Sequence, residues 1–210
     1  MRITAVKFAV FAGALLFAGA VQSQAQALKT VTAKKETTPG PVQIVALDEC
    51  DPTTFNRPPS PDGDPNKGGV GPDFCKNVAL GAQTDFAGLF TKAGQGHPDP
   101  NWDFEPDDVT VRKGAQIVVL NSGGEPHTFT EVKQFGGGFI PPLNGGEPTA
   151  TECNGGFANL AVARTRILQG SQYQVNGLSK GEHHFQCCIH PWMRVTVEVK
   201  DDNDNPGHDR

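Results

Sequence analysis

The chain has 210 residues, of which 18 are Lys or Arg and 23 are Asp or Glu, and its formal net charge is −5. No patch of Lys and Arg stands out along it, which excludes nucleic acid as the expected partner. The 25 glycines and 17 prolines, with no long helical pattern, favour a β protein with many loops.

The first 27 residues have the organisation of a secretory signal peptide. Arg2 and Lys7 precede the apolar run FAVFAGALLFAGAV, and the small-residue segment QSQAQA follows it. A transmembrane anchor is the alternative, but the run is shorter than the roughly 20 residues that a span needs. We therefore expect residues 1–27 to be removed on export to the periplasm or the medium, with no stable membrane insertion. The remaining chain has a formal charge of −7, because Arg2 and Lys7 are lost with the signal.

Residues 28–99 are interpreted as a loop-rich N-terminal extension, in which VQIVAL (42–47) is able to add an edge strand. Residues 50–75 are rich in Pro, Gly, Asp and Asn, a composition that predicts no core. Five cysteines in an exported chain indicate disulfides, and the odd count leaves one thiol free. We interpret residues 50–75 as a loop closed by a Cys50–Cys75 disulfide or as a linker; disorder, with these cysteines paired elsewhere, is the alternative.

A pattern of short strands begins near residue 100. DVTV (108–111) and AQIVVLN (115–121) are expected strands, and the turn RKG between them indicates a hairpin or a sheet corner. A further strand is expected to start at His127. Residues 133–160 then form a long Gly/Pro-rich insertion, which is typical of a functional or poorly ordered connection. Later strands are expected at residues 161–168, 171–178, 181–187 and 194–200, before a charged tail at 201–210. The pattern predicts an all-β sandwich or barrel of about 110 residues.

The turn between the last two expected strands has Cys187, His190 and Met193 at every third position. Together with His127 from an earlier strand, they offer one thiolate, two imidazoles and one thioether, which is the ligand set of a mononuclear electron-transfer copper site. Zinc is the main chemical alternative, but zinc prefers more Cys or His and no thioether. Each residue alone has an ordinary explanation, as half of a disulfide, a hydrogen-bonded histidine or a core methionine. None of these explains the shared spacing.

At these residues the chain resembles the cupredoxin family of type 1 blue copper proteins. The turn FQCCIHPWMRVTVEV is similar to the Cys-x-x-His-Pro-x-Met motif of the amicyanin and plastocyanin branch, and FEPDDVTVRKGAQIVVLNSGGEPHTF resembles the family's first conserved stretch. The resemblance covers about residues 100–200. It implies a Greek-key β-sandwich that binds one type 1 copper ion, Cu(I)/Cu(II). It also implies His127, Cys187 and His190 as equatorial ligands and Met193 as the axial ligand.

The family resemblance implies an exported one-electron carrier rather than an enzyme. We expect a monomer, with a redox partner protein that docks near His190 and Trp192. In the family, the residue after the first histidine helps to hold the ligand loop, and Thr128 has that place here. The alternative function is copper binding for delivery or storage. A metal-free scaffold domain is a third hypothesis, which the intact ligand set disfavours.

Three features depart from the family: the second cysteine Cys188, the 133–160 insertion and residues 28–99. Cys188 as the ligand would give Cys-x-His, which is too tight for the usual turn, and adjacent cysteines leaving a strand point to opposite sides. We favour a Cys153–Cys188 disulfide that tethers the insertion, although the four other cysteines allow three pairings. His183 and His184 are expected to be solvated strand histidines.

Overall fold

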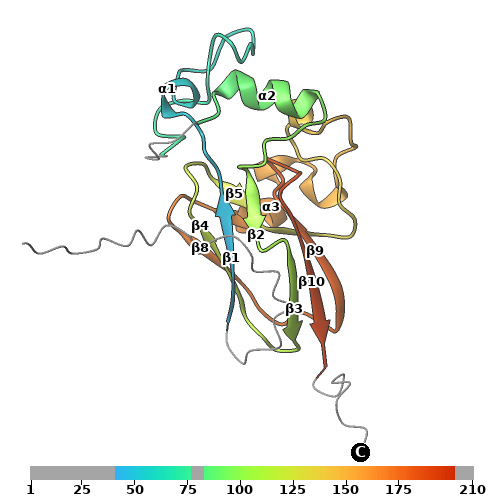
Figure 1. Cartoon of the computed structure of the whole chain (residues 1–210). Coiled ribbons are helices and arrows are strands. Elements are labelled where there is room, and N and C mark those ends of the chain that lie inside the picture. The colour runs from blue at the N-terminus through green and yellow to red at the C-terminus, as the bar shows by residue number, and fades with distance from the viewer. Residues whose placement is uncertain (1–40, 77–82, 202–210) are drawn as a thin grey trace, which may run out of the picture. The chain divides into compact units, whose positions relative to one another are not determined.

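A computed structural model describes residues 41–76 and 83–201 of the chain (Figure 1). The expected signal peptide, residues 1–27, and all but the first residue of the charged tail lie outside these ranges. Ten strands form two four-stranded sheets and one short strand pair in this part of the chain.

The first sheet has the order β2-β1-β4-β8 and the second the order β3-β10-β9-β6. The strands of the first sheet are β2 (Asp103–Glu105), β1 (Val42–Leu47), β4 (Ile117–Asn121) and β8 (Gln172–Val175). Those of the second are β3 (Asp108–Arg112), β10 (Arg194–Lys200), β9 (Gly181–Gln186) and β6 (Thr130–Val132). The short pair is β5 (His127–Thr128) with β7 (Arg166–Ile167). Strands distant in sequence are neighbours in both sheets, as in a Greek key.

The hydrophobic core lies between the two sheets because their strands alternate buried and exposed residues. In β10, Val195, Val197 and Val199 are buried, whereas the residues between them are not. In β4, Ile117 and Val119 are buried, and they belong to the same core cluster as the β10 valines. The all-β sandwich expected from the sequence is confirmed.

The turn RKG is a sheet corner and not a hairpin. β3 pairs in parallel with β10, whereas β4 pairs with β1 and β8 in the other sheet. The chain therefore crosses from one layer to the other between residues 112 and 117.

Strand β1 is an inner strand, so its expected edge position is wrong. It pairs antiparallel with β2 on one side and in parallel with β4 on the other. Ile44 and Ala46 are fully buried in the core. Part of the N-terminal extension is thus built into the sandwich. Because β1 and β4 are parallel, the residues that follow β1 lie beside those that follow β4 (Figure 1).

The segment 50–75 is closed by a Cys50–Cys75 disulfide, as expected. It contains a short helix, α1 (Pro52–Phe55), capped by Asp51, whose side chain accepts a hydrogen bond from the amide of Thr53. The expectation that this segment contributes nothing to a core is wrong. Phe55 is fully buried and stacks on Trp102 with ring centroids 6.3 Å apart.

Two further helices occur where the sequence pattern indicated none. α2 (Phe86–Gly94) is capped by Asp85, whose carboxylate accepts a 2.8 Å hydrogen bond from the amide of Gly88. α3 (Leu160–Arg164) replaces the first half of the strand expected at 161–168, and β7 is the strand found in that segment. Asn159 caps α3 through the amide of Ala161, and Leu and Ala are strong helix formers. The strand expected from the alternating residues of AVAR is therefore wrong, and this segment is helical.

The insertion at residues 133–160 packs against the turn that follows β9. It contains three 3-10 helices, η1 (Pro141–Leu143), η2 (Thr151–Cys153) and η3 (Gly156–Ala158). A disulfide joins Cys153 to Cys188, as favoured from the sequence, and the amide of Phe139 donates a 2.8 Å hydrogen bond to the Cys188 carbonyl. Both contacts fix the insertion beside the cysteine pair.

Among the helices of the described ranges, none has the length and apolar character required to cross a membrane.

Candidate metal centre

The turn from Cys187 to Met193 joins β9 to β10 and closes on itself. The amide of Cys187 donates to the Met193 carbonyl, and the amide of Met193 donates to the His190 carbonyl, each over 3.0 Å. The amide of His190 lies 3.5 Å from the Cys187 sulfur. This narrow loop places the sulfur and the His190 imidazole on the same side.

His127 lies on β5, in the short strand pair with β7, and the chain reaches it through the turn that follows β4. Asn121 ends β4 and is fully buried; its amide nitrogen donates to the carbonyls of Glu125 (2.7 Å) and Ile167 (3.0 Å). Its side-chain oxygen accepts from the amide of Gly123. Asn121 thereby satisfies the backbone groups of the tight turn that leads into β5, where His127 lies.

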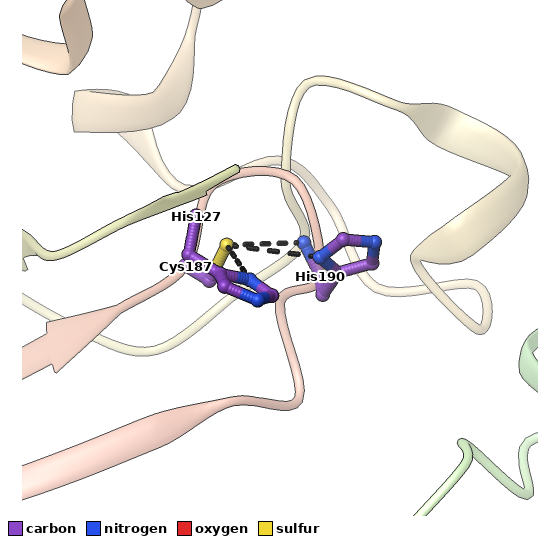
Figure 2. A group of neighbouring side chains, drawn as sticks. All are labelled: His127, Cys187 and His190. Atoms are coloured by element: carbon purple, nitrogen blue, oxygen red, sulfur yellow. Dashed lines mark hydrogen bonds between the residues drawn. The ribbon is translucent and has the colours of Figure 1, made fainter. Parts of the chain in front are cut away.

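His127, Cys187 and His190 converge at one point. Their potential ligand atoms all lie within 4.8 Å of one another, and all three residues are buried. The Cys187 sulfur is 3.9 Å from Nδ1 of His127 and 4.0 Å from Nδ1 of His190. Figure 2 shows the sulfur facing both imidazole rings. Two nitrogens and one sulfur at these separations are able to surround a single ion.

The electrostatics of the site favour a thiolate. Burial opposes ionisation of Cys187, but its hydrogen bonds with His127 and His190 outweigh burial and hold the pKa of Cys187 well below its usual value. The amide of Thr128 also points at the sulfur over 3.5 Å. Cys187 is the free cysteine of the chain, because the other four form disulfides. The thiolate is the form that binds metals.

Two other sequence expectations concern this loop. Thr128 holds it twice, since its hydroxyl oxygen also accepts a 2.8 Å hydrogen bond from the Cys188 amide. Met193 is fully buried in the same core cluster as Cys187, at the end of the ligand turn. Its assignment as axial ligand stays a prediction.

Two buried carboxylates beside the histidines were not anticipated from the sequence. Asp48, just after β1, lies with Oδ2 at 2.9 Å from Nε2 of His127. Glu125 lies with Oε2 at 3.5 Å from Nε2 of His190 and accepts a 2.6 Å hydrogen bond from Nε1 of Trp102. Glu125 lies two residues before His127, so the sequence could have predicted that it is close to the site. No local signal pointed to Asp48.

Burial and charge act in opposite directions on these carboxylates. Burial raises the pKa of Glu125 to about 7, against the lowering effect of His190. Burial acts likewise on Asp48, but its hydrogen bond with His127 and those from two backbone amides prevail and lower the pKa of Asp48. For His127, burial disfavours the charged form, while Asp48 and Cys187 outweigh it and raise the pKa of His127.

His190, near which we expect a redox partner to dock, is buried, since only 1% of its surface is accessible. Trp192 packs against its ring with centroids 5.5 Å apart, and Trp102 lies 6.2 Å away on centroids. Nε1 of Trp192 donates to the Trp102 carbonyl, which ties the two covering residues together. Trp192 itself is half-buried and is therefore the side chain that brings His190 toward the surface.

His183 and His184 are outside the site. His183 and His184 lie on β9. His183 pairs with Glu131 of the neighbouring strand β6 over 2.7 Å, and His184 pairs with Glu182 of β9 over 2.9 Å. They are strand histidines with acidic neighbours, and both are partly buried, so neither is as fully solvated as the sequence led us to expect.

The comparison with solved structures finds cupredoxins. A mutant of amicyanin in the Cu(I) form is 16% identical, with 47% of this chain and 73% of that chain covered and a TM-score of 0.31. The reduced state of another amicyanin mutant is 17% identical at the same coverage and TM-score. A purple cupredoxin from Nitrosopumilus maritimus is 11% identical, with 76% and 99% covered and a TM-score of 0.35. No protein-family model matches the chain, and no curated protein matches it.

The fold can be judged from the described strands alone. Two four-stranded sheets enclose one core, β1 and β4 run in parallel, and the loop between β9 and β10 closes over the end of the sandwich. The chain thus has an all-β sandwich, and a group of two histidines and one cysteine is buried in it.

Proposed function

We propose that the chain is an exported, mononuclear type 1 copper protein that carries single electrons and is not an enzyme. The observation that carries this proposal is the convergence of Cys187 with Nδ1 of His127 and Nδ1 of His190 in a buried site. A copper ion held there supplies a centre that gains and loses one electron. Met193 is proposed as the weak axial ligand.

The donor chemistry fits copper. A thiolate and two imidazoles suit both Cu(I) and Cu(II), so the oxidation state changes without a new set of ligands. Two backbone amides, those of Thr128 and His190, point at the sulfur and favour its negative charge. The narrow 187–193 turn and the Asn121-braced turn hold the donors in place before any ion binds.

Copper delivery or storage is the second candidate, and the burial of the ligands argues against it. A delivery protein must pass the ion itself to a partner, whereas an electron crosses a thin layer of side chains. Here His127 and Cys187 are fully buried and His190 is covered by Trp102 and Trp192. We therefore propose a redox partner protein that docks over Trp192, with this chain as a monomer.

The deciding experiment is the visible spectrum of the mature chain, with both disulfides formed, after addition of Cu(II). We expect an intense thiolate-to-Cu(II) band that disappears on reduction and is absent from Cys187→Ser. The double variant Cys153→Ser/Cys188→Ser serves as the control, because the sulfurs of Cys153 and Cys188 bind each other and leave no further thiol free. A protein that binds Cu(I) tightly but shows no such band is a delivery or storage protein. A band that survives in Cys187→Ser contradicts the ligand assignment.

Export is proposed from residues 1–27 and is consistent with the two disulfides, which form in oxidising compartments. Expression of the whole chain should yield a periplasmic or secreted protein that begins at about residue 28. N-terminal sequencing of that product checks the cleavage site, and retention of residues 1–27 would contradict it.

A further inference from the structure

The carboxylate of Asp48 is aimed at the segment that carries His127. Oδ2 lies 2.9 Å from Nε2 of His127 and accepts a 2.9 Å hydrogen bond from the amide of Glu125. Oδ1 accepts from the amide of Gly124 over 2.9 Å and from that of Cys50 over 3.3 Å. Three backbone donors and one imidazole thus share a single carboxylate.

The surrounding backbone leaves room for this carboxylate and for little else. The side chains of Asp48 and His127 are both fully buried. A Cβ atom added at Gly123 would overlap the carboxylate of Asp48, so the residue between Ser122 and Gly124 has to lack a side chain. A buried carboxylate is costly unless hydrogen bonds satisfy its oxygens, and here they do. The turn after β4 is therefore shaped around Asp48.

The hydrogen bond between Asp48 and His127 decides which nitrogen of His127 is free to bind a metal. A carboxylate accepts hydrogen bonds, so the proton of this hydrogen bond is carried by Nε2 of His127, which donates it to Asp48. The other nitrogen, Nδ1, is left to face the sulfur of Cys187, 3.9 Å away. A carboxylate in this position fixes the tautomer and the ring orientation of a metal-binding histidine and makes the histidine a stronger donor.

We propose that Asp48 is a positioning residue of the metal centre, which fixes His127 for ligation through Nδ1 and biases the bound metal toward its oxidised state. This inference rests on the proposed copper function. When the site accepts one electron from its redox partner, the metal charge falls by one, and no bond is formed or broken. A buried anion bonded to one ligand favours the more positive state. Removal of Asp48 should therefore favour Cu(I).

Glu125 provides an internal comparison. Its Oε2 lies 3.5 Å from Nε2 of His190, beyond ordinary hydrogen-bond length, and its short 2.6 Å bond is made with Trp102. Glu125 therefore holds its histidine less tightly than Asp48 holds His127. The effect of Glu125→Gln should be smaller than that of Asp48→Asn, although both changes remove one buried carboxylate.

The test compares copper affinity and reduction potential in Asp48→Asn, Glu125→Gln and Asp99→Asn. Asn keeps the size of Asp48 but removes its charge and one of its two acceptor oxygens, so its NH2 group must face either His127 or backbone amides that also donate. We expect Asp48→Asn to weaken Cu(II) binding by about 10- to 100-fold. At a fixed ambient potential, Asp48→Asn should lower the ratio of oxidised to reduced protein by about tenfold. This change corresponds to a rise of about 59 mV in the reduction potential of a one-electron couple.

Asp99→Asn is the matched control, because Asp99 is equally buried but bonds to Lys92 and Thr84 instead of a proposed ligand. Its potential should equal that of the wild type. If Asp48→Asn leaves affinity and potential unchanged, or shifts them no more than Asp99→Asn does, the inference is overturned.

A measurement on the unmutated protein covers the case in which Asp48→Asn does not fold. Reduced copper is diamagnetic, so NMR of the reduced wild type can follow the imidazole protons. We expect a slowly exchanging proton on Nε2 of His127 and none on Nδ1. A rapidly exchanging or missing Nε2 proton overturns the role of Asp48. Failure of the proposed function looks different, since the wild type would then bind no copper or give no thiolate band.

Discussion

The hydroxyl oxygen of Thr128 accepts a 2.8 Å hydrogen bond from the amide of Cys188, a residue 60 positions away in the chain. The amide of Thr128 meanwhile lies 3.5 Å from the sulfur of Cys187. One residue of β5 therefore contacts both adjacent cysteines, and it joins the His127 strand to the loop that provides the other proposed ligands.

Thr128→Val should destabilise the fold without removing the copper band. Valine keeps the shape and the backbone amide that faces Cys187, but it leaves the buried amide of Cys188 without an acceptor. Loss of that acceptor should lower the free energy of unfolding by about 1–3 kcal/mol. Chemical denaturation checks the stability and the visible spectrum checks the site. Thr128→Ser, which retains the hydroxyl, is the control, and equal stability of the Val variant and the wild type would contradict this role.

The Cys153–Cys188 disulfide should contribute stability and not copper binding. The double variant Cys153→Ser/Cys188→Ser avoids a new free thiol beside Cys187. We expect it to retain the thiolate-to-Cu(II) band and to lose about 2–5 kcal/mol of unfolding free energy, as is usual for a native disulfide.

The double variant Cys50→Ser/Cys75→Ser is the matched comparison for that loss. Both disulfides close loops of similar length, with sequence separations of 35 and 25 residues. Only the first is attached to the ligand turn. Loss of colour in the Cys153/Cys188 variant with colour retained in the other would show that the disulfide also supports the site.

Asp99 should make stability depend on pH in the acidic range. Burial opposes its ionisation, but hydrogen bonds from Lys92, over 2.5 Å, and from Thr84 outweigh burial and lower the pKa of Asp99. A carboxyl group with a lowered pKa stabilises the fold above its unfolded pKa of about 3.9. That stabilisation is lost as the pH falls through the lower, folded pKa.

Urea unfolding of the wild type and of Asp99→Asn between pH 6 and pH 2.5, at about half-unit steps, measures this contribution. We expect Asp99→Asn to be less stable near pH 6 by roughly 1–3 kcal/mol. The difference should shrink as the pH falls below about 3.9, the unfolded pKa of an aspartate. A difference that stays constant over this range would mean that the charge of Asp99 is not what stabilises the fold.

Trp192 should control electron exchange and not the spectrum. Its ring packs on His190 and it is the half-buried member of the pair that covers this ligand. Trp192→Ser should slow electron self-exchange, measured by NMR line broadening in mixtures of oxidised and reduced protein, while the visible band keeps its position. Trp192→Phe, which keeps an aromatic ring over His190, should exchange faster than the Ser variant. Unchanged kinetics in Trp192→Ser would place the docking surface elsewhere.

Local pattern predicted most of the second sheet and placed three of the four proposed ligands on one turn. The Val/polar alternation of residues 194–200 follows from a sheet with one buried face, so it is visible without any tertiary information. Cys187 and His190 lie on one short turn, and their spacing predicted that they come together; Met193 ends the same turn, and its role as a ligand stays a prediction. The Cys153–Cys188 disulfide was favoured from the sequence and is confirmed, although the four cysteines allowed three pairings.

The expectations from local pattern are wrong at one segment for a local reason and at two others because of contacts over long sequence distances. AVAR alternates like a strand, yet the Asn159 cap and the propensities of Leu and Ala make it helical. VQIVAL was recognised as strand-like, but its inner position depends on pairing with β4, some 70 residues later. The loop around Phe55 has the composition of a segment without a core, and only its packing on Trp102 contradicts that interpretation.

The sequence by itself predicted the class of site, because a thiolate, two imidazoles and a thioether at these spacings suit few metals other than copper. Only the tertiary structure decided what surrounds those ligands. Asp48 reaches His127 because β1 and β4 run in parallel and end together, a relation between residues 79 positions apart that no local pattern encodes. The burial of His190 has the same origin, since Trp102 lies 88 positions earlier in the chain and meets the ligand turn only when the sandwich closes.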